Sequence, residues 1–303
     1  MNTNNAQEAQ QPRRVGLVGV GLMGSGIAQN IVKHGHKLTI LDHPGNQPVG
    51  ALLAAGATAV SDVTALAAEV DVLILCVTGT PQVEAVMLGQ DGNGGALASL
   101  RPGTVVIDCS TAVPDSTTKV AQAVQAKGGK FLDAPMTRTA KEAAEGRLNL
   151  LVGGDAEVLA SCLPLLRCFA ENITHVGGIG AGHAMKLLHN FVSLGTVALL
   201  CEAAACAQRA GVAPDVFVDV LAKGGGNGVA LERVKPKLLT GSTDSLKFSM
   251  ANAKKDLGYY NDMAQQSSAS HGIAEAVEKL LAHGIDTFGP DRMVLDLVEA
   301  LKK

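Results

Sequence analysis

The chain has 303 residues, a formal net charge of −3 and 47 % hydrophobic residues. This length predicts roughly two domains of about 150 residues each. Lys and Arg form no long run, which argues against a nucleic-acid-binding surface. The N-terminus is polar and has no apolar signal core. The most apolar helix candidate, residues 191–201, falls short of the roughly 20 residues that cross a bilayer. We therefore expect no nucleic-acid partner, no membrane span and a cytoplasmic location.

The elements predicted along the chain change character near residue 178. Residues 1–12, rich in Asn and Gln, predict a disordered tail. In residues 13–178, short apolar runs alternate with amphipathic helical segments, which predicts βαβ units and a doubly wound Rossmann sheet. Several runs lack the alternation of a half-exposed strand, as is typical of buried parallel strands. The predicted strands are residues 15–19, 37–42, 72–77, 104–109, 130–134 and 149–153.

Residues 179–303 contain no convincing strand. A long helix is predicted from Ala181 to Gly211, with Gly211 and Pro214 as stop signals. Further helical segments follow it. The predicted fold is therefore an α/β Rossmann domain followed by an all-α domain, joined by a long interdomain helix. The six cysteines form no CxxC pair, and we interpret them as small core residues of a protein from a reducing compartment.

The first predicted strand runs directly into a glycine-rich loop and then a helical segment. In this setting a GxGxxG pattern indicates a dinucleotide-binding loop. Its first glycine permits the tight turn, its second lets the backbone approach the pyrophosphate, and its third lets helix pack on strand. The helix N-terminus offers N–H groups to the phosphates. The candidate cofactor-binding residues are Gly19, Val20, Gly21, Leu22, Met23 and Gly24.

Asp42 ends the next predicted strand, where the fingerprint places an acidic residue that binds the adenine ribose. A carboxylate at this position repels a 2′-phosphate, so we expect NAD, with NADP less favoured. The alternative is that Asp42 only begins the turn at His43-Pro44-Gly45. His43 would also soften the preference through a partial positive charge.

Five ordered segments resemble the β-hydroxyacid dehydrogenase family, which includes 3-hydroxyisobutyrate dehydrogenases, tartronate semialdehyde reductases and sulfolactaldehyde reductases. They are residues 19–30 with 35–36, then 108–111, 133–135, 182–190 and 255–257. The resemblance implies an active site in the cleft between a Rossmann domain and a helical domain. It also implies a homodimer or homotetramer that assembles through the helical domain, and a small anionic hydroxy acid or semialdehyde as substrate.

Lys186, Asn190 and Ser193 have the spacing i, i+4, i+7, which places them on one helix face. The neighbouring residues are apolar, and partial desolvation lowers the pKa of a lysine. Lys186 also matches the family's catalytic position, so we expect it to act as general acid and base. Asn190 would orient Lys186 and bind the substrate. Ser193 and Asp256 are further candidate substrate-binding residues, and the chain resembles sulfolactaldehyde reductases at Ser193 as well as at Arg138 and Thr139. The family commonly has two adjacent Asn residues, whereas this chain has His189 before Asn190. His189 either faces the pocket or is a half-buried helix residue.

The predicted substrate loop departs most from the family, which usually has Ser-Gly-Gly where this chain has Thr137, Arg138 and Thr139. Arg138 adds a planar cation, and Thr139 with Glu142 forms a capping-box pattern. One interpretation is that Arg138 holds a sulfonate, a dicarboxylate semialdehyde or a longer hydroxy acid. The other is that Thr139 only caps the helix and Arg138 points to solvent.

The resemblance assigns further contacts. Val77 and Thr78 would lie near the ribose, Thr111 near the nicotinamide, and Lys255 over the cleft with Asp256 beside it. Taken alone, residues 254–256 are a solvated charge run. No metal-binding cluster is evident among the histidines.

The function that these residues favour is that of an NAD(P)-dependent 3-hydroxyacid dehydrogenase or semialdehyde reductase. One alternative is an imine reductase of the same fold, although such proteins typically replace the catalytic lysine. A second alternative is a non-catalytic dinucleotide-binding module, although the family's known example lacks the lysine and carries extra domains.

Overall fold

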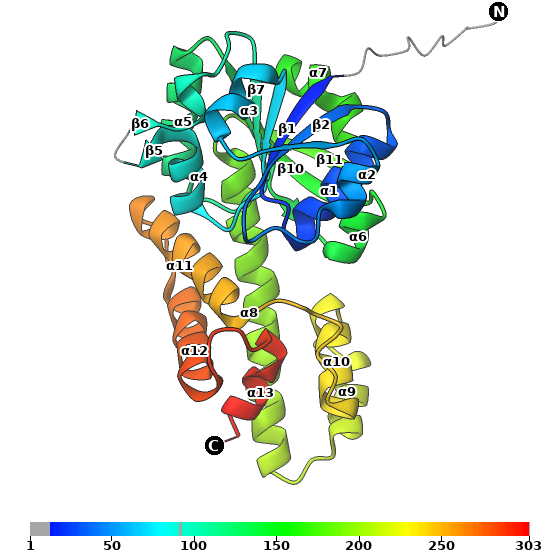
Figure 1. The fold of residues 1–303 in the computed structure, drawn as a ribbon. Coiled ribbons are helices and arrows are strands. Elements are labelled where there is room, and N and C mark those ends of the chain that lie inside the picture. Colours follow the sequence, from blue (N-terminus) through cyan, green and yellow to red (C-terminus); the bar gives the residue numbers. More distant parts are fainter. Residues whose placement is uncertain (1–12, 91–92, 303) are drawn as a thin grey trace, which may run out of the picture. The chain divides into compact units, whose positions relative to one another are not determined.

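The computed structural model describes residues 13–90 and 93–302 (Figure 1). The predicted tail at residues 1–12 lies outside the described residues. The chain divides into two compact units between His183 and Ala184, five residues beyond the predicted boundary. The first unit is built on a sheet, and the second contains helices.

The sheet of the first unit has nine strands, and β3-β2-β1-β4-β7-β8 form a parallel array in that spatial order. This order is that of a dinucleotide-binding sheet, with the reversal of strand order beside β1. β10 then pairs antiparallel with β8 and with β9, and parallel with β11. The strands are β1 Arg14–Val18, β2 Lys37–Leu41, β3 Thr58–Val60, β4 Val72–Leu75, β7 Val105–Asp108, β8 Lys130–Asp133, β9 Met136–Thr137, β10 Leu148–Gly154 and β11 Ala170–Gly177. A separate hairpin joins β5 Gly89–Gln90 to β6 Asn93–Gly94.

Helices cover both faces of this sheet (Figure 1). Val72 and Ile74 of β4 pack with α1, α2, α6 and α7 on one face, whereas Leu73 and Leu75 pack with α3, α4, α5 and η1 on the other. Both faces are buried because side chains of a strand alternate between them. The helices are α1 Leu22–Lys33, α2 Gly50–Ala54, α3 Val63–Glu69, α4 Thr80–Leu88, η1 Ala96–Ala98, α5 Pro114–Ala126, α6 Ala140–Ala144 and α7 Ala156–Leu166.

The second unit has one apolar core, formed by α8, α10, α11, α12, η2 and α13. Its elements are α8 Ala181–Arg209, which begins in the first unit, α9 Pro214–Ala222, α10 Val229–Thr240, α11 Met250–Gln266, α12 Gly272–Phe288, η2 Val294–Asp296 and α13 Leu297–Ala300. Within the described part of this unit, the β-pairing is a single bridge between Ser249 and Met293. The predicted fold class, a Rossmann unit followed by a helical unit, is confirmed.

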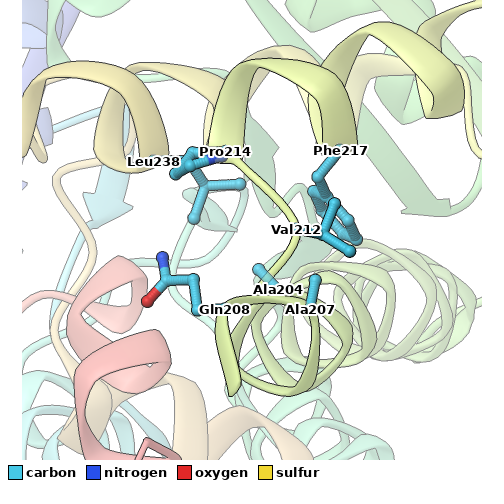
Figure 2. Close-up of a pocket in the computed structure, with 7 residues that line it drawn as sticks. All are labelled: Ala204, Ala207, Gln208, Val212, Pro214, Phe217 and Leu238. Atoms are coloured by element: carbon cyan, nitrogen blue, oxygen red, sulfur yellow. The ribbon is translucent and has the colours of Figure 1, made fainter. Parts of the chain in front are cut away.

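The helix α8 has 29 residues and, within the described chain, is the one helix long and apolar enough to cross a membrane by length and composition. Core helices of soluble proteins pass the same test, and 44 % of its most apolar window is buried. Figure 2 shows how its end packs near α9 and α10. That recess has no room for a water molecule, and its walls are Ala204, Ala207, Gln208, Val212, Pro214, Phe217 and Leu238.

Candidate active site

The glycine loop between β1 and α1 has three glycines with three different surroundings. Gly19 has φ +94°, and a Cβ there would lie 2.3 Å from the carbonyl oxygen of Cys76. A Cβ on Gly24 would lie 1.9 Å from the carbonyl oxygen of Gly19. Beside Gly21 a Cβ would meet nothing within 4 Å. Gly19 and Gly24 are therefore required by the fold, whereas Gly21 leaves open space for a ligand to approach the backbone.

The predicted cofactor residues of the first unit, Asp42, Val77, Thr78 and Thr111, lie just after the carboxyl ends of β2, β4 and β7, whereas Lys255 lies on α11 of the second unit. Loops after β1, β4 and β7 meet where strand order reverses, which is where ligands bind in open α/β sheets. The Cys76 N–H donates to the Val18 carbonyl at 2.8 Å. The Val77 N–H donates to Ser110 Oγ at 3.0 Å, which joins the loops that carry Thr78 and Thr111. These contacts suit the loops for holding a dinucleotide.

Asp42 follows β2 and is exposed, as binding of a ribose requires. A residue that we did not predict, Asn46, connects its loop to the glycine loop. Asn46 Oδ1 accepts from the Val20 N–H at 3.1 Å, and its Nδ2 donates to the Leu41 carbonyl at 2.9 Å. The only sequence signal was an Asn in a turn-forming segment.

A buried polar network lies within the first unit at the start of α8. Asp133 accepts hydrogen bonds from the N–H groups of Gly180 at 2.8 Å and His183 at 2.9 Å. The His183 ring lies 2.7 Å from Thr117 Oγ1 and 3.9 Å from Asp108 Oδ2. Asp108, Asp133 and His183 have no exposed surface, and burial raises the pKa of Asp108. The network fixes the first turn of α8 onto the carboxyl ends of β7 and β8.

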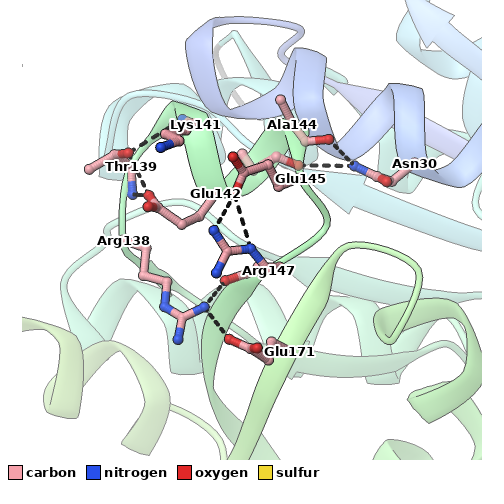
Figure 3. Close-up of polar contacts among 10 residues, drawn as sticks. Asn30, Arg138, Thr139, Lys141, Glu142, Ala144, Glu145, Arg147 and Glu171 are labelled. Carbon is pink, nitrogen blue, oxygen red and sulfur yellow. Dashed lines mark hydrogen bonds and ion pairs between the residues drawn. The ribbon is translucent and has the colours of Figure 1, made fainter.

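The predicted substrate loop makes contacts within its own unit (Figure 3). Arg138, in the left-handed region at φ +80°, donates from Nη1 to the Arg147 carbonyl and to Glu171 on β11. Its guanidinium is therefore partly exposed and has Glu171 as its counter-ion. Thr137 is buried and lies 3.1 Å from Asn149 Nδ2.

Thr139 caps α6, which confirms the predicted capping box. Its Oγ1 accepts from the Lys141 N–H at 3.3 Å and donates to Glu142 Oε2 at 2.5 Å, while its own N–H donates to the same oxygen. These hydrogen bonds lower the pKa of Glu142. The hydroxyl of Thr139 is thus already engaged in the cap.

The second unit brings Lys186 and Asn190 of α8 together with Lys255 and Asp256 of α11. Asn190 Nδ2 donates to Asp256 Oδ2 at 2.6 Å, and both side chains are buried. Lys255 Nζ lies 3.2 Å from Asp256 Oδ1. Burial lowers the pKa of Lys186 to about 8, an effect that Asp256 opposes and Lys255 reinforces. A lysine with this pKa exchanges a proton readily near neutral pH.

His189 and Ser193 complete this part of α8. His189 is exposed, and its Nδ1 lies 3.0 Å from Asn190 Oδ1, so the ring contacts the amide. Partial desolvation is the main cause that lowers the pKa of His189. Ser193 Oγ accepts from Arg233 Nη1 of α10 at 3.3 Å. We did not predict Arg233, since neither its spacing nor any motif in the sequence marks it.

Two family models together match nearly the whole described chain. Residues 14–177 match the NAD binding domain of 6-phosphogluconate dehydrogenase. Residues 180–301 match the NAD-binding model of NADP-dependent 3-hydroxyisobutyrate dehydrogenase. The 2-(hydroxymethyl)glutarate dehydrogenase of Eubacterium barkeri is 32 % identical over 81 % of this chain and 80 % of its own length. The chain belongs to the β-hydroxyacid dehydrogenase family.

Other members of the β-hydroxyacid dehydrogenase family are similar to this chain in sequence or in fold. The 3-sulfolactaldehyde reductase of Escherichia coli (strain K12) is 32 % identical, with 83 % of each chain covered. The solved 3-hydroxyisobutyrate dehydrogenase of Mycobacterium tuberculosis has a TM-score of 0.85 at 26 % identity, covering 96 % of this chain and 100 % of that one. Solved imine reductases, at 20 % identity or less, share only the fold. The chain is thus an NAD(P)-dependent oxidoreductase of the hydroxyacid dehydrogenase type, and its family includes NADP-dependent enzymes.

Within the described residues, no group of three or more His, Cys, Asp or Glu side chains is placed to hold a metal ion.

Proposed function

We propose that this enzyme interconverts a small anionic hydroxy acid and its semialdehyde, with Lys186 as the general acid and base. The observation that carries the proposal is the position of Lys186, whose pKa is lowered to about 8 beside the buried pair of Asn190 and Asp256. In the direction of oxidation, neutral Lys186 accepts the proton of the substrate hydroxyl. In reduction, the ammonium returns that proton to the carbonyl oxygen.

Asn190 is suited to orient the substrate. A side-chain amide has two N–H donors and one oxygen acceptor. One N–H donates to Asp256, and the oxygen contacts His189. The second N–H is left to bind the reacting oxygen, next to Lys186 on the same face of α8. When bound, NAD(P) accepts or supplies the hydride at the carbon that bears this oxygen.

We further propose that the preferred cofactor is NAD. Asp42 is exposed directly after β2 and accepts hydrogen bonds from ribose hydroxyls, whereas its charge disfavours a 2′-phosphate. We also propose a homodimer or homotetramer, because Leu188, Val192 and Leu199 expose an apolar stripe along α8.

The test is a turnover screen with NAD and NADP. The panel contains 3-hydroxyisobutyrate, glycerate, 4-hydroxybutyrate and 2,3-dihydroxypropanesulfonate. We expect NAD-linked oxidation of at least one of them, with kcat/KM at least tenfold above that with NADP. Reduction of cyclic imines without oxidation of any panel acid would favour an imine reductase instead. Binding of NADH without turnover of either class would indicate a non-catalytic module.

A further inference from the structure

Arg233 carries a positive charge to the face of α8 that holds the proposed catalytic residues. It lies on α10, is partly buried, and its Nη1 donates to Ser193 Oγ at 3.3 Å. Its charge also contributes to lowering the pKa of His189. The hydrogen bond and the electrostatic effect both act within the helical unit. They relate α10 to the face of α8 that carries Lys186, Asn190 and Ser193.

Among the described residues, the guanidinium of Arg233 has no carboxylate counter-ion, in contrast to Arg138, Lys255 and Lys237. Arg138 pairs with Glu171, and Lys255 pairs with Asp256. On the same helix as Arg233, Lys237 pairs with Asp296 at 2.7 Å. In the part of the chain that the structure describes, no carboxylate lies within ion-pair distance of Arg233. A partly buried cation without a partner gains from an anionic ligand.

The position of Ser193 relates this cation to the reacting group. Ser193 is three residues beyond Asn190, so it lies about 4.5 Å further along the axis of α8. Arg233 and Ser193 therefore lie beyond the proposed proton-transfer group at one end of a single helix face. A planar guanidinium and a hydroxyl together donate several hydrogen bonds to the oxygens of one acid group.

We propose that Arg233 and Ser193 bind the acid group of the substrate, a carboxylate or sulfonate, while Lys186 and Asn190 engage its hydroxyl. Arg233 is then the residue that selects anionic substrates, in place of Arg138, whose charge Glu171 already compensates. This inference rests on the proposed function, since it assigns the recognition of that same hydroxy acid.

The experiment compares Arg233→Met with Lys235→Met, which removes a positive charge two residues away on the same helix. The first probe is the panel acid that the wild type oxidises best. The second is its deoxy analogue, which keeps the acid group, lacks the hydroxyl and is used as a competitive inhibitor. For Arg233→Met we expect KM and the inhibition constant to rise roughly 10- to 100-fold, the loss typical of a charge-assisted hydrogen bond. We expect kcat and the dissociation constant of NADH to change less than threefold, as loss of uniform binding predicts.

The control Lys235→Met should leave all four quantities within about twofold, as is usual for surface substitutions. Arg233→Lys keeps the charge without the planar fork, so it should recover part of the affinity and serves if Arg233→Met does not fold. An unchanged inhibition constant in Arg233→Met, or an equal rise in Lys235→Met, would overturn the assignment. Failure of the wild type to oxidise any hydroxy acid would instead overturn the proposed function, independently of both variants.

Discussion

Asn190 and Asp256 form a buried hydrogen bond of 2.6 Å that joins α8 to α11. His189 Nδ1 lies 3.0 Å from the Asn190 oxygen, and Lys255 Nζ lies 3.2 Å from the other oxygen of Asp256. The bond fixes the amide beside Lys186 and leaves a carboxylate close enough to act on the pKa of that lysine.

Two substitutions on α11 should move the pH profile of oxidation in opposite directions. Oxidation requires neutral Lys186, so kcat/KM should rise with pH through about 8 and then level off. Asp256 raises the pKa of Lys186, so Asp256→Asn should shift this limb to lower pH. Lys255 lowers it, so Lys255→Met should shift the limb to higher pH. Profiles are measured at saturating cofactor, and shifts in the same direction in both variants would contradict this assignment.

Two glycines of the dinucleotide loop should respond differently to alanine. In Gly21→Ala the methyl group meets open space, so the melting temperature should stay near that of the wild type. A bound pyrophosphate would occupy that space, so affinity for NADH should fall roughly tenfold or more. In Gly24→Ala the methyl group overlaps the Gly19 carbonyl, so stability should fall by roughly 2 kcal/mol or more. Unchanged NADH affinity in Gly21→Ala would place the cofactor elsewhere.

Asp42→Ala should change the choice of cofactor. Loss of the hydrogen bonds to ribose should lower kcat/KM with NAD roughly tenfold or more, with little loss for NADP. Asn46→Ala provides the comparison, because Asn46 holds Val20 of the glycine loop and its loss should affect both cofactors alike. Equal losses of kcat/KM with NAD and NADP in Asp42→Ala would indicate that Asp42 only begins the turn and does not bind the ribose.

Asp133→Ala should destabilise the first unit by roughly 2–4 kcal/mol, because two buried N–H donors at the start of α8 lose their acceptor. Asp155 is the matched control, since it also accepts two N–H bonds, from Glu157 and Val158, but at an exposed helix start. Asp155→Ala should cost only about 1 kcal/mol. Similar losses in chemical unfolding of the two variants would remove the special role of burial at Asp133.

Most of the Rossmann unit could be predicted because its strands are buried on both faces and read as apolar runs. All six predicted strands are present, within one or two residues of their predicted ends. The missed strands are the two-residue strands β5, β6 and β9 and the two outer strands of the main sheet, β3 and β11. β11 has polar residues such as Glu171 and Asn172 at the edge of the sheet, and β3 has three residues that are mostly exposed. An edge strand needs no continuous apolar run, so the search for apolar runs found neither β11 nor β3.

The candidate site was predictable only where a motif marks a residue. The glycines and Lys186 belong to such motifs, whereas Asn46 and Arg233 act through contacts with residues on other elements. The ion pair between Arg138 and Glu171 could not be predicted, because Glu171 lies on β11, a strand that the sequence pattern did not indicate. Pairings of this kind follow from tertiary structure and leave no local pattern.

Turnover by Lys186→Ala tests the proposed role of Lys186 as general acid and base most directly. The variant should bind NADH with the affinity of the wild type, since Lys186 lies on α8 of the helical unit, outside the glycine loop. Its kcat for the best hydroxy acid should fall roughly 10²- to 10⁴-fold, the contribution typical of a general acid or base. A variant that binds NADH normally and keeps more than a few per cent of wild-type kcat would contradict the proposed role of Lys186.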